Sequence, residues 1–334
     1  MRARKGYTVV WTRRALVRFL SLGTAALLLG LSPYLYGLGL RYCRGVKPGV
    51  TLAGRPVGLL LAHELRKAVQ ELAGTYYRPA RSAYFDPASQ RVIPEEPGQE
   101  LAVEETVQRV LAARPGEEVQ PVLRQLRPLT VARQFTPVYR GESGRPLVAL
   151  MFNVAWGEEE LPRLLTVLAE KKVRATFFVV GTWARRFPHL VRELSTGGHE
   201  VANHGLEHVH PATLAEEEVM RLIIENEHLL KELGCRPAKL FAPPYGEVSP
   251  QMVRVAAALG YYTVLWTADT VDWKRPRPEV ILRRAEKGAQ PGGLLLMHPT
   301  APTVSALPLL IDALRRAGLE PATVSQVLGL EGSE

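Results

Sequence analysis

The second half of the chain alternates short apolar segments with longer amphipathic ones, and this alternation restricts the folds open to it. The apolar segments, rich in Val, Leu and Phe, predict strands over residues 147–153, 175–180, 200–204, 239–242, 262–267, 293–298 and 320–323. The intervening segments predict helices over residues 159–171, 184–195, 214–233, 250–259, 277–287 and 304–317. Such alternation predicts a mostly parallel sheet covered by helices. The number of repeats suggests a β/α barrel, either closed or incomplete.

Polar residues stand where several of these predicted strands end. The strand exits are Asn153, Gly181, His204, Ala242, Asp269 and His298. In a β/α barrel the carboxyl ends of the strands share one face, and active sites are built there. The two histidines and the acidic residue at these exits therefore predict a functional site.

The first half of the chain predicts a separate small α+β domain over residues 46–135. Its pattern is a short strand pair, a helix, a hairpin, a second helix and a final strand, over residues 50–52, 55–59, 63–72, 81–93, 103–112 and 119–126. The order and the stretch GVTLAGRPVG resemble the peptidoglycan-binding module of some Gram-positive envelope proteins. A spacer domain is the alternative interpretation. Residues 136–146, with two prolines and two glycines, predict a linker to the domain at 147–330.

The excess positive charge of the chain lies near its N-terminus. The formal charge is +9, yet residues 1–47 hold nine basic residues and no acidic one, so the remainder is formally neutral. A basic surface for nucleic acid is therefore not expected, and no nucleic-acid partner is predicted. Residues 19–40 contain no charged side chain and are long enough to cross a bilayer. Basic residues before this span predict a cytoplasmic N-terminus.

We therefore expect residues 1–45 to form a cytoplasmic tail and a single transmembrane anchor. The bulk of the chain would then lie outside the cytoplasm, at the cell membrane. A cleaved signal peptide is the alternative, and it is disfavoured because no A-x-A-like site follows the apolar stretch. Cys43 and Cys235 are too few for a disulfide framework or a thiolate metal site.

Four short motifs in the second half carry residue types suited to hydrolysis. NHGLEH places His204 and His208 four residues apart, and imidazole is a common ligand of zinc and similar metals. FAPPYG predicts a rigid turn that contains Tyr245, and such a turn can present a backbone N–H to an oxyanion. ADTVDW offers two carboxylates and an indole, and LLLMH ends in His298. An Asp that pairs with a His makes a general acid.

With these motifs in this order, the chain resembles the polysaccharide deacetylases of the NodB-homology, carbohydrate esterase family 4 type over residues 147–330. The resemblance implies a deformed (β/α) barrel and metal-assisted hydrolysis of N-acetyl groups on a glycan. It assigns the metal to His204 and His208, the general acid to His298 with its partner Asp272, and the substrate-binding positions to Tyr245, Trp273 and Leu296; Asp269 lies near the fourth motif.

The first motif departs from the family pattern, because MFNVAWG stands in place of TFDDG. Asn153 occupies the position of the catalytic base, Val154 that of the third, anionic metal ligand, and Ala242 that of an arginine beside the base. Because the base and the arginine are both absent, neither leaves an unpaired buried charge. Removal of one alone would destabilise the fold by about 3–5 kcal/mol. The NVAWG and FAPP motifs with a membrane anchor resemble a sporulation-associated branch of the family.

Three functions follow from this pattern. The preferred one is a pseudoenzyme of the cell envelope that binds N-acetylated glycan, such as peptidoglycan, without hydrolysing it. The second is an active N-deacetylase with a divalent metal such as zinc, in which Glu158, Glu159 or Glu160 substitutes for the missing carboxylates. The third is a non-catalytic scaffold in sporulation or wall assembly. The sequence assigns no protein partner and no oligomeric state.

Overall fold

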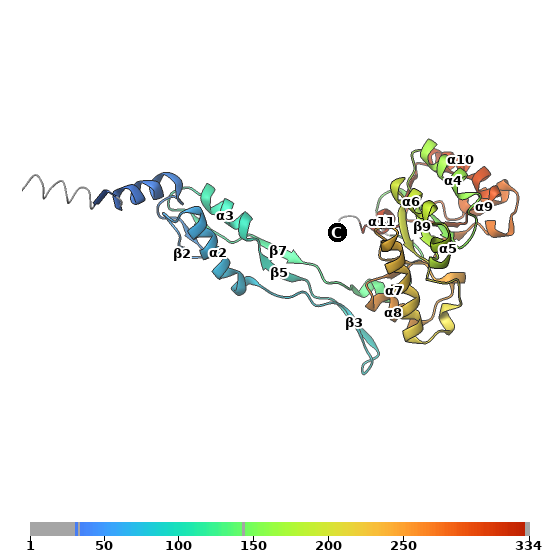
Figure 1. Ribbon diagram of the computed structural model, residues 1–334, viewed down its shortest axis with the longest axis horizontal. Helices are drawn as coiled ribbons and strands as arrows, with labels where there is room; N and C mark the ends of the chain where they lie inside the picture. The colour runs from blue at the N-terminus through green and yellow to red at the C-terminus, as the bar shows by residue number, and fades with distance from the viewer. Residues whose placement is uncertain (1–30, 33, 142–143, 331–334) are drawn as a thin grey trace, which may run out of the picture. The chain divides into compact units, whose positions relative to one another are not determined.

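The computed structural model describes residues 31–32, 34–141 and 144–330, and the chain divides into two compact units. The smaller unit comprises residues up to Ala80 together with Pro97–Arg127, and the larger one Arg81–Glu96 together with the chain from Pro128 onward (Figure 1). Most of the expected transmembrane segment lies outside the described residues. Within the described part, no helix is long and apolar enough to cross a membrane.

The smaller unit packs two helices against short strands. Its elements are β1 (Thr51–Leu52), β2 (Arg55–Pro56), α2 (Ala62–Tyr76), β5 (Gly98–Leu101), α3 (Val103–Ala112), β6 (Glu118–Val119) and β7 (Leu123–Leu126). Strand β1 pairs antiparallel with β2 and parallel with β6, while β5 pairs antiparallel with β7. Apolar residues three or four apart on both helices, such as Leu65 and Val69, enter one buried cluster with Val50 and Leu52.

The predicted hairpin is present but belongs to the larger unit. Strands β3 (Tyr84–Asp86) and β4 (Arg91–Ile93) pair antiparallel, and the Asp86 carboxylate accepts hydrogen bonds from the backbone of Ala88 and Ser89 in the turn. The guanidinium of Arg254 lies 4.7 Å from the centre of the Phe85 ring. The two units therefore interleave in sequence around residue 96, whereas the predicted boundary kept residues 46–135 together.

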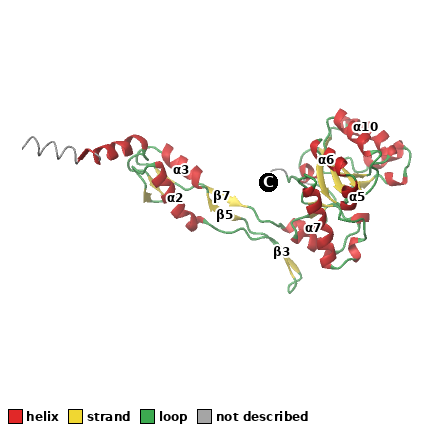
Figure 2. Ribbon diagram, in the orientation of Figure 1, coloured by secondary structure: helices red, strands yellow, loops and turns green. Residues whose placement is uncertain are grey.

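The larger unit contains a parallel sheet of eight strands. They are β8 (Leu147–Val154), β9 (Thr176–Val179), β10 (Glu200–Asn203), β11 (Leu240–Phe241), β12 (Tyr262–Thr263), β13 (Ala268–Asp269), β14 (Leu294–Met297) and β15 (Glu320–Ala322). Their order is β12-β11-β10-β9-β8-β14-β13, with β15 also paired to β8. All these pairings are parallel, as the alternating pattern predicted. Figure 2 shows strands of this unit in yellow among red helices. Within the described residues β12 and β13 do not pair, so the barrel is incomplete.

Helices cover the outside of this sheet in the order that the sequence predicted. They are α4 (Leu161–Glu170), α5 (Gly181–Arg186), α6 (Pro188–Thr196), α7 (Glu216–Glu232), α8 (Pro250–Ala258), α9 (Pro278–Glu286) and α10 (Ala301–Arg316). A further short helix that was not predicted, α11 (Val324–Leu328), packs on the inner side of the sheet. One predicted helix is divided into α5 and α6, because Pro188 lacks an N–H and begins a new helix. The predicted strand at 262–267 is shorter than expected, because only β12 falls within it. β13 follows it along the chain and lies at the opposite end of the sheet.

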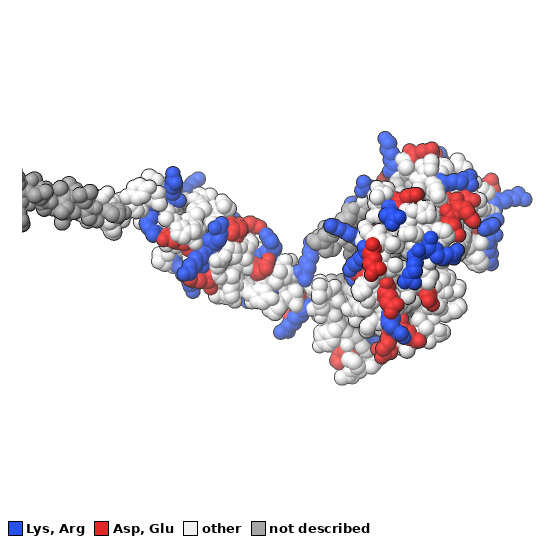
Figure 3. Space-filling model, in the orientation of Figure 1, with Lys and Arg blue, Asp and Glu red and all other residues white. Residues whose placement is uncertain are grey.

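The two faces of β8 enter different cores. Val148, Leu150, Phe152 and Val154 pack in the cluster between the sheet and the outer helices. Ala149 and Met151 instead pack inside the barrel, together with residues of α11. Successive side chains of a strand point to opposite faces, so Asn153 follows Met151 on the inner side. On the face of the larger unit shown in Figure 3, acidic and basic side chains are interspersed.

A partly buried carboxyl group at the first residue of β10 predicts a pH dependence of stability. Oε2 of Glu200 accepts hydrogen bonds from Oγ1 of Thr176 at 2.6 Å and from the backbone N–H of Ser325 at 3.3 Å. Burial raises the pKa of Glu200 despite these hydrogen bonds. The folded chain therefore binds this proton more readily than the unfolded chain, and stability falls as pH rises above the ordinary glutamate value of about 4.3.

We expect Glu200→Gln to remove this dependence. The variant should be more resistant to urea than wild type at neutral pH, and the difference should shrink toward pH 4, where the wild-type carboxyl is protonated. Urea unfolding at several pH values measures this. Glu193→Gln, at an exposed carboxylate, is the control. A stability difference that grows as pH falls would contradict the prediction.

Candidate functional site

Side chains at the carboxyl ends of the strands surround a cavity of about 480 Å³. The residues that line it are Asn153, Ala155, Trp156, His204, His208, Tyr245, Gly246, Trp266, Asp269, Trp273, Leu296 and His298. The structure thus brings together the predicted residues at the exits of β8, β10 and β14. Two predicted residues stand apart from the lining: Asp272 lies behind His298, and Val154 faces the outer helices.

The two histidines of NHGLEH are held in a neutral form. His204 is fully buried, and its Nδ1 lies 2.6 Å from the carbonyl oxygen of Ala242, so Nδ1 carries the proton and donates it. Nε2 is then left as an acceptor. Burial lowers the pKa of His204 to about 3, and burial followed by the charge of His298 lowers that of His208. Both imidazoles are therefore neutral at neutral pH, with one ring nitrogen free to bind a cation.

A buried polar network positions this histidine segment. Oδ1 of Asn203 accepts hydrogen bonds from the backbone N–H of Gly205 and from Nδ2 of Asn226, both at 2.8 Å. Nδ2 of Asn203 donates to the carbonyl of Ile223 in α7 at 2.8 Å. Sequence reasoning missed this network. A signal was available, because Asn226 shares the buried face of α7 with apolar residues at helical spacing, including Leu222 and Ile223.

The structure contains the predicted Asp–His pair of the general acid. Nδ1 of His298 lies 2.8 Å from Oδ1 of the fully buried Asp272. Oδ2 of Asp272 accepts from the backbone N–H of His298 and from Oγ1 of Thr303, each at 2.6 Å. The carboxylate therefore orients the ring and leaves Nε2 for the cavity. The indole of Trp156 stacks on the ring, with centroids 5.7 Å apart and planes within 3°.

The FAPPYG turn holds Tyr245 in an unusual backbone conformation at the rim. Tyr245 has φ of +59°, a region that non-glycine residues enter rarely, and Gly246 follows with φ of +67°. A Cβ at position 246 would lie 2.3 Å from Trp266, so only glycine permits this packing. The Tyr245 ring stacks on His210 at 4.1 Å, and His210 pairs with Glu247 at 2.8 Å. Packing against Trp266 and stacking on His210 thus hold the turn in place.

An amide stands at the position of the catalytic base, and the neighbouring metal site lacks its third ligand. Asn153 is buried, and its Oδ1 has no hydrogen-bond partner within the described part of the chain. Val154 packs among apolar side chains, so the third-ligand position does not reach the cavity. Two neutral imidazoles and an amide do not fit catalytic zinc, which takes three protein ligands such as His₃ or His₂Glu. No group of three His, Cys, Asp or Glu residues suited to a metal occurs in the described ranges.

The glutamates that follow MFNVAWG are engaged elsewhere or lie outside the cavity lining. Oε2 of Glu158 accepts a hydrogen bond from Nε1 of Trp183 at 3.3 Å, and Glu160 pairs with Arg163 at 2.9 Å. Glu159 is not among the residues that line the cavity. None of the three therefore stands in for the missing carboxylates in this structure. Asp269 does line the cavity, and its Oδ1 accepts from the backbone N–H of Val271 at 2.7 Å.

An incomplete parallel barrel, with a histidine pair, an Asp–His pair and aromatic walls at its carboxyl edge, defines a carbohydrate-esterase barrel. Comparison with known proteins agrees. The sequence profile of polysaccharide deacetylases matches residues 140–264. The chain is 30% identical over 202 residues to a peptidoglycan-N-acetylglucosamine deacetylase of Bacillus cereus, covering 59% of this chain and 74% of that protein. The chain belongs to the polysaccharide deacetylase family, in its NodB-homology, carbohydrate esterase family 4 group.

Two further relatives share more of the chain. The uncharacterized protein YlxY of Bacillus subtilis is 33% identical over 239 residues, which are 71% of this chain and 75% of that protein. The crystal structure of BA3943 from Bacillus anthracis, described as a pseudoenzyme of carbohydrate esterase family 4, is 29% identical with a TM-score of 0.57 and covers 79% of this chain and 94% of that one. A mutant of BA3943 with restored enzymatic activity has the same TM-score.

Proposed function

We propose that this protein is a pseudoenzyme of the polysaccharide deacetylase family that binds N-acetylated glycan of the cell envelope without hydrolysing it. The observation that carries the proposal is the composition of the cavity. Its aromatic walls and Asp272–His298 pair are intact, while an amide and an outward-facing valine replace the base and the metal carboxylate. The proposal includes the membrane anchor expected over residues 19–40, which would hold the barrel at the outer face of the membrane.

The chemistry of position 153 argues against turnover. An amide cannot take a proton from water near neutral pH, whereas a carboxylate or an imidazole can. Without a third, anionic ligand the two imidazoles make a weak site for a divalent metal. The similarity to BA3943, a described pseudoenzyme that a mutation returned to activity, supports this interpretation.

The same residues suit the binding of a sugar ring. Trp156, Tyr245 and Trp273 line the cavity and are 38%, 54% and 48% exposed. His298 covers one face of Trp156 and His210 one face of Tyr245, and the exposed part of each ring is open to a ligand. Aromatic rings bury apolar surface at little cost in side-chain entropy. The free Oδ1 of Asn153 is an acceptor at the floor, and the N–H of an acetamido group would satisfy it.

Binding and turnover of a neutral N-acetylglucosamine tetramer by the full chain test this proposal. We expect saturable binding in calorimetry and no release of acetate, with or without added Zn²⁺. Trp273→Ala should weaken binding about tenfold or more, because truncation of a central aromatic side chain costs on the order of 2 kcal/mol. Tyr139→Ala, at an equally exposed aromatic residue outside the cavity, should not. Acetate release that Zn²⁺ stimulates in wild type would overturn the proposal.

A further inference from the structure

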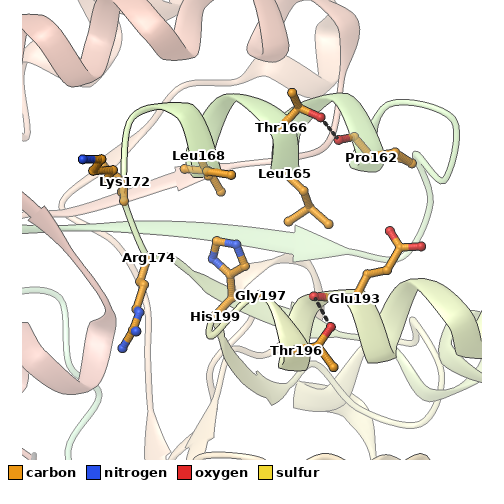
Figure 4. Close-up of a pocket in the computed structure, with 12 residues that line it drawn as sticks. Pro162, Leu165, Thr166, Leu168, Lys172, Arg174, Glu193, Thr196, Gly197 and His199 are labelled. Atoms are coloured by element: carbon orange, nitrogen blue, oxygen red, sulfur yellow. Dashed lines mark hydrogen bonds between the residues drawn. The ribbon is translucent and has the colours of Figure 1, made fainter.

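A second cavity, of about 810 Å³, lies on the outer side of the barrel between α4 and α6 (Figure 4). It shares no residue with the cavity at the strand ends. Leu165, Leu168 and Val173 supply apolar surface to its lining. Figure 4 shows Lys172 and Arg174 at one end, Glu193 toward the other, and the ring of His199 between them. The cavity therefore combines apolar and polar lining residues, with basic side chains at one end and an acidic one toward the other.

His199 presents a hydrogen-bond donor to this cavity. Its Nδ1 accepts the backbone N–H of Ala175 at 3.2 Å, and its ring meets Phe177 edge-on at 5.2 Å, which fixes the orientation. Burial and the charge of Arg174 lower the pKa of His199 to about 4, so the ring is neutral at neutral pH. With Nδ1 accepting, the single proton sits on Nε2. No hydrogen-bond partner of Nε2 occurs among the described residues.

The cationic end is not neutralised by the protein. Neither Lys172 nor Arg174 forms an ion pair with any described residue, whereas the neighbouring Lys171 pairs with Asp312 at 2.7 Å.

The other polar groups of the cavity have little to donate. The hydroxyl of Thr166 donates to the carbonyl of Pro162 at 3.0 Å, and that of Thr196 donates to the carbonyl of Arg192 at 2.9 Å, so both serve their own helices. The free donors are thus on Lys172 and Arg174 at one end and on His199 between the two ends. A free acceptor, the Glu193 carboxylate, lies toward the other end.

We propose that this outer cavity is a second glycan site, selective for an N-acetylated saccharide that carries a carboxylate. The carboxylate lies between Lys172 and Arg174 and accepts from Nε2 of His199. The sugar ring covers Leu165, and its hydroxyl groups donate to Glu193. This inference rests on the proposed glycan binding and adds a preference for acidic sugars. Charge-assisted hydrogen bonds to a carboxylate are stronger than neutral ones, which is why the charged group dominates recognition here.

The test compares two disaccharides on the full chain by calorimetry. One is the disaccharide of N-acetylglucosamine and N-acetylmuramic acid, which carries a carboxylate, and the other is neutral diacetylchitobiose. Lys172→Gln/Arg174→Gln should weaken binding of the acidic disaccharide at least fivefold and that of the neutral one less than twofold. Arg283→Gln/Lys287→Gln removes the same charge from exposed positions of α9 and its end and should change neither. Leu165→Trp, which fills the cavity, should reproduce the loss without altering charge.

The outcomes separate this inference from the proposed function. If wild type binds neither disaccharide in a manner sensitive to Trp156→Ala, the proposed function fails. Occupancy of the outer cavity is measured separately by the NMR resonance of the His199 Nε2–H. This resonance should shift on addition of the acidic disaccharide and not of the neutral one. An unshifted His199 resonance, or equal weakening by the two charge-removing variants, would overturn the second site.

Discussion

Replacement of both Asn153 and Val154 by aspartate is expected to give a chain that releases acetate from an N-acetylglucosamine tetramer when Zn²⁺ is present. The first substitution supplies a carboxylate at the cavity floor, and a general base contributes about 10²–10⁴ to a rate. The second supplies an anionic metal ligand for His204 and His208 once residue 154 turns from the outer helices toward the cavity. Acetate release with and without Zn²⁺ measures the effect, and the variant should exceed wild type by at least about 10².

The folding of this double variant gives a second, independent readout. Val154 packs in an apolar cluster, so an aspartate there without a partner should lower the free energy of unfolding by about 3 kcal/mol. Zn²⁺ that binds only the folded chain recovers about 2.7 kcal/mol at one hundred times its Kd. The thermal unfolding temperature of the variant should therefore rise with Zn²⁺, while that of wild type should not.

Asn153→Asp alone is the matched control. It places one carboxylate in the cavity without completing a set of metal ligands, so neither activity nor a Zn²⁺-dependent unfolding temperature is expected. Ala242 is left unchanged, because its side chain is fully buried and an arginine would displace its neighbours. If Zn²⁺ has no effect on the double variant, position 154 cannot turn from the outer helices to the cavity.

Asp272→Ala is expected to lower the free energy of unfolding by about 2–5 kcal/mol, because it removes the buried carboxylate that accepts three hydrogen bonds. The backbone N–H and Nδ1 of His298 and the hydroxyl of Thr303 would all lose their partner. Urea unfolding measures the loss. Because Trp156 stacks on His298, its fluorescence should also change when the ring is released.

Thr303→Val is the graded control for this prediction. It keeps the shape of the side chain and removes only one of the three donors to Asp272, so a loss of about 1 kcal/mol is expected. Asp272→Asn, which retains an oxygen acceptor, should fall between the two. A loss below about 0.5 kcal/mol for Asp272→Ala, a value typical of exposed positions, would show that the carboxylate does not hold His298 in place.

Much of the site followed from local pattern. The histidines of NHGLEH and the histidine after LLLM stand at strand exits, and parallel strands bring their carboxyl ends to one edge. The division of one predicted helix at Pro188 and the short strands β12 and β13 did not follow, because strand length depends on partners far along the chain. The polar network joins Asn203 at the end of β10 to Asn226 in α7. The helical spacing indicates that Asn226 is buried, but its partner lies twenty-three residues away and is set by the fold.

By itself the sequence determined the alternating elements, the parallel sheet and the absence of aspartate from MFNVAWG, because each depends on residue type and spacing along the chain. Tertiary structure decided which side chains face the same cavity and which protonation state each of them adopts. Successive side chains of β8 point to opposite faces, and the fold decides that the face with Asn153 borders the cavity while the face with Val154 meets the outer helices. His204 is neutral because the surrounding barrel removes it from water, and no spacing of residues encodes that burial.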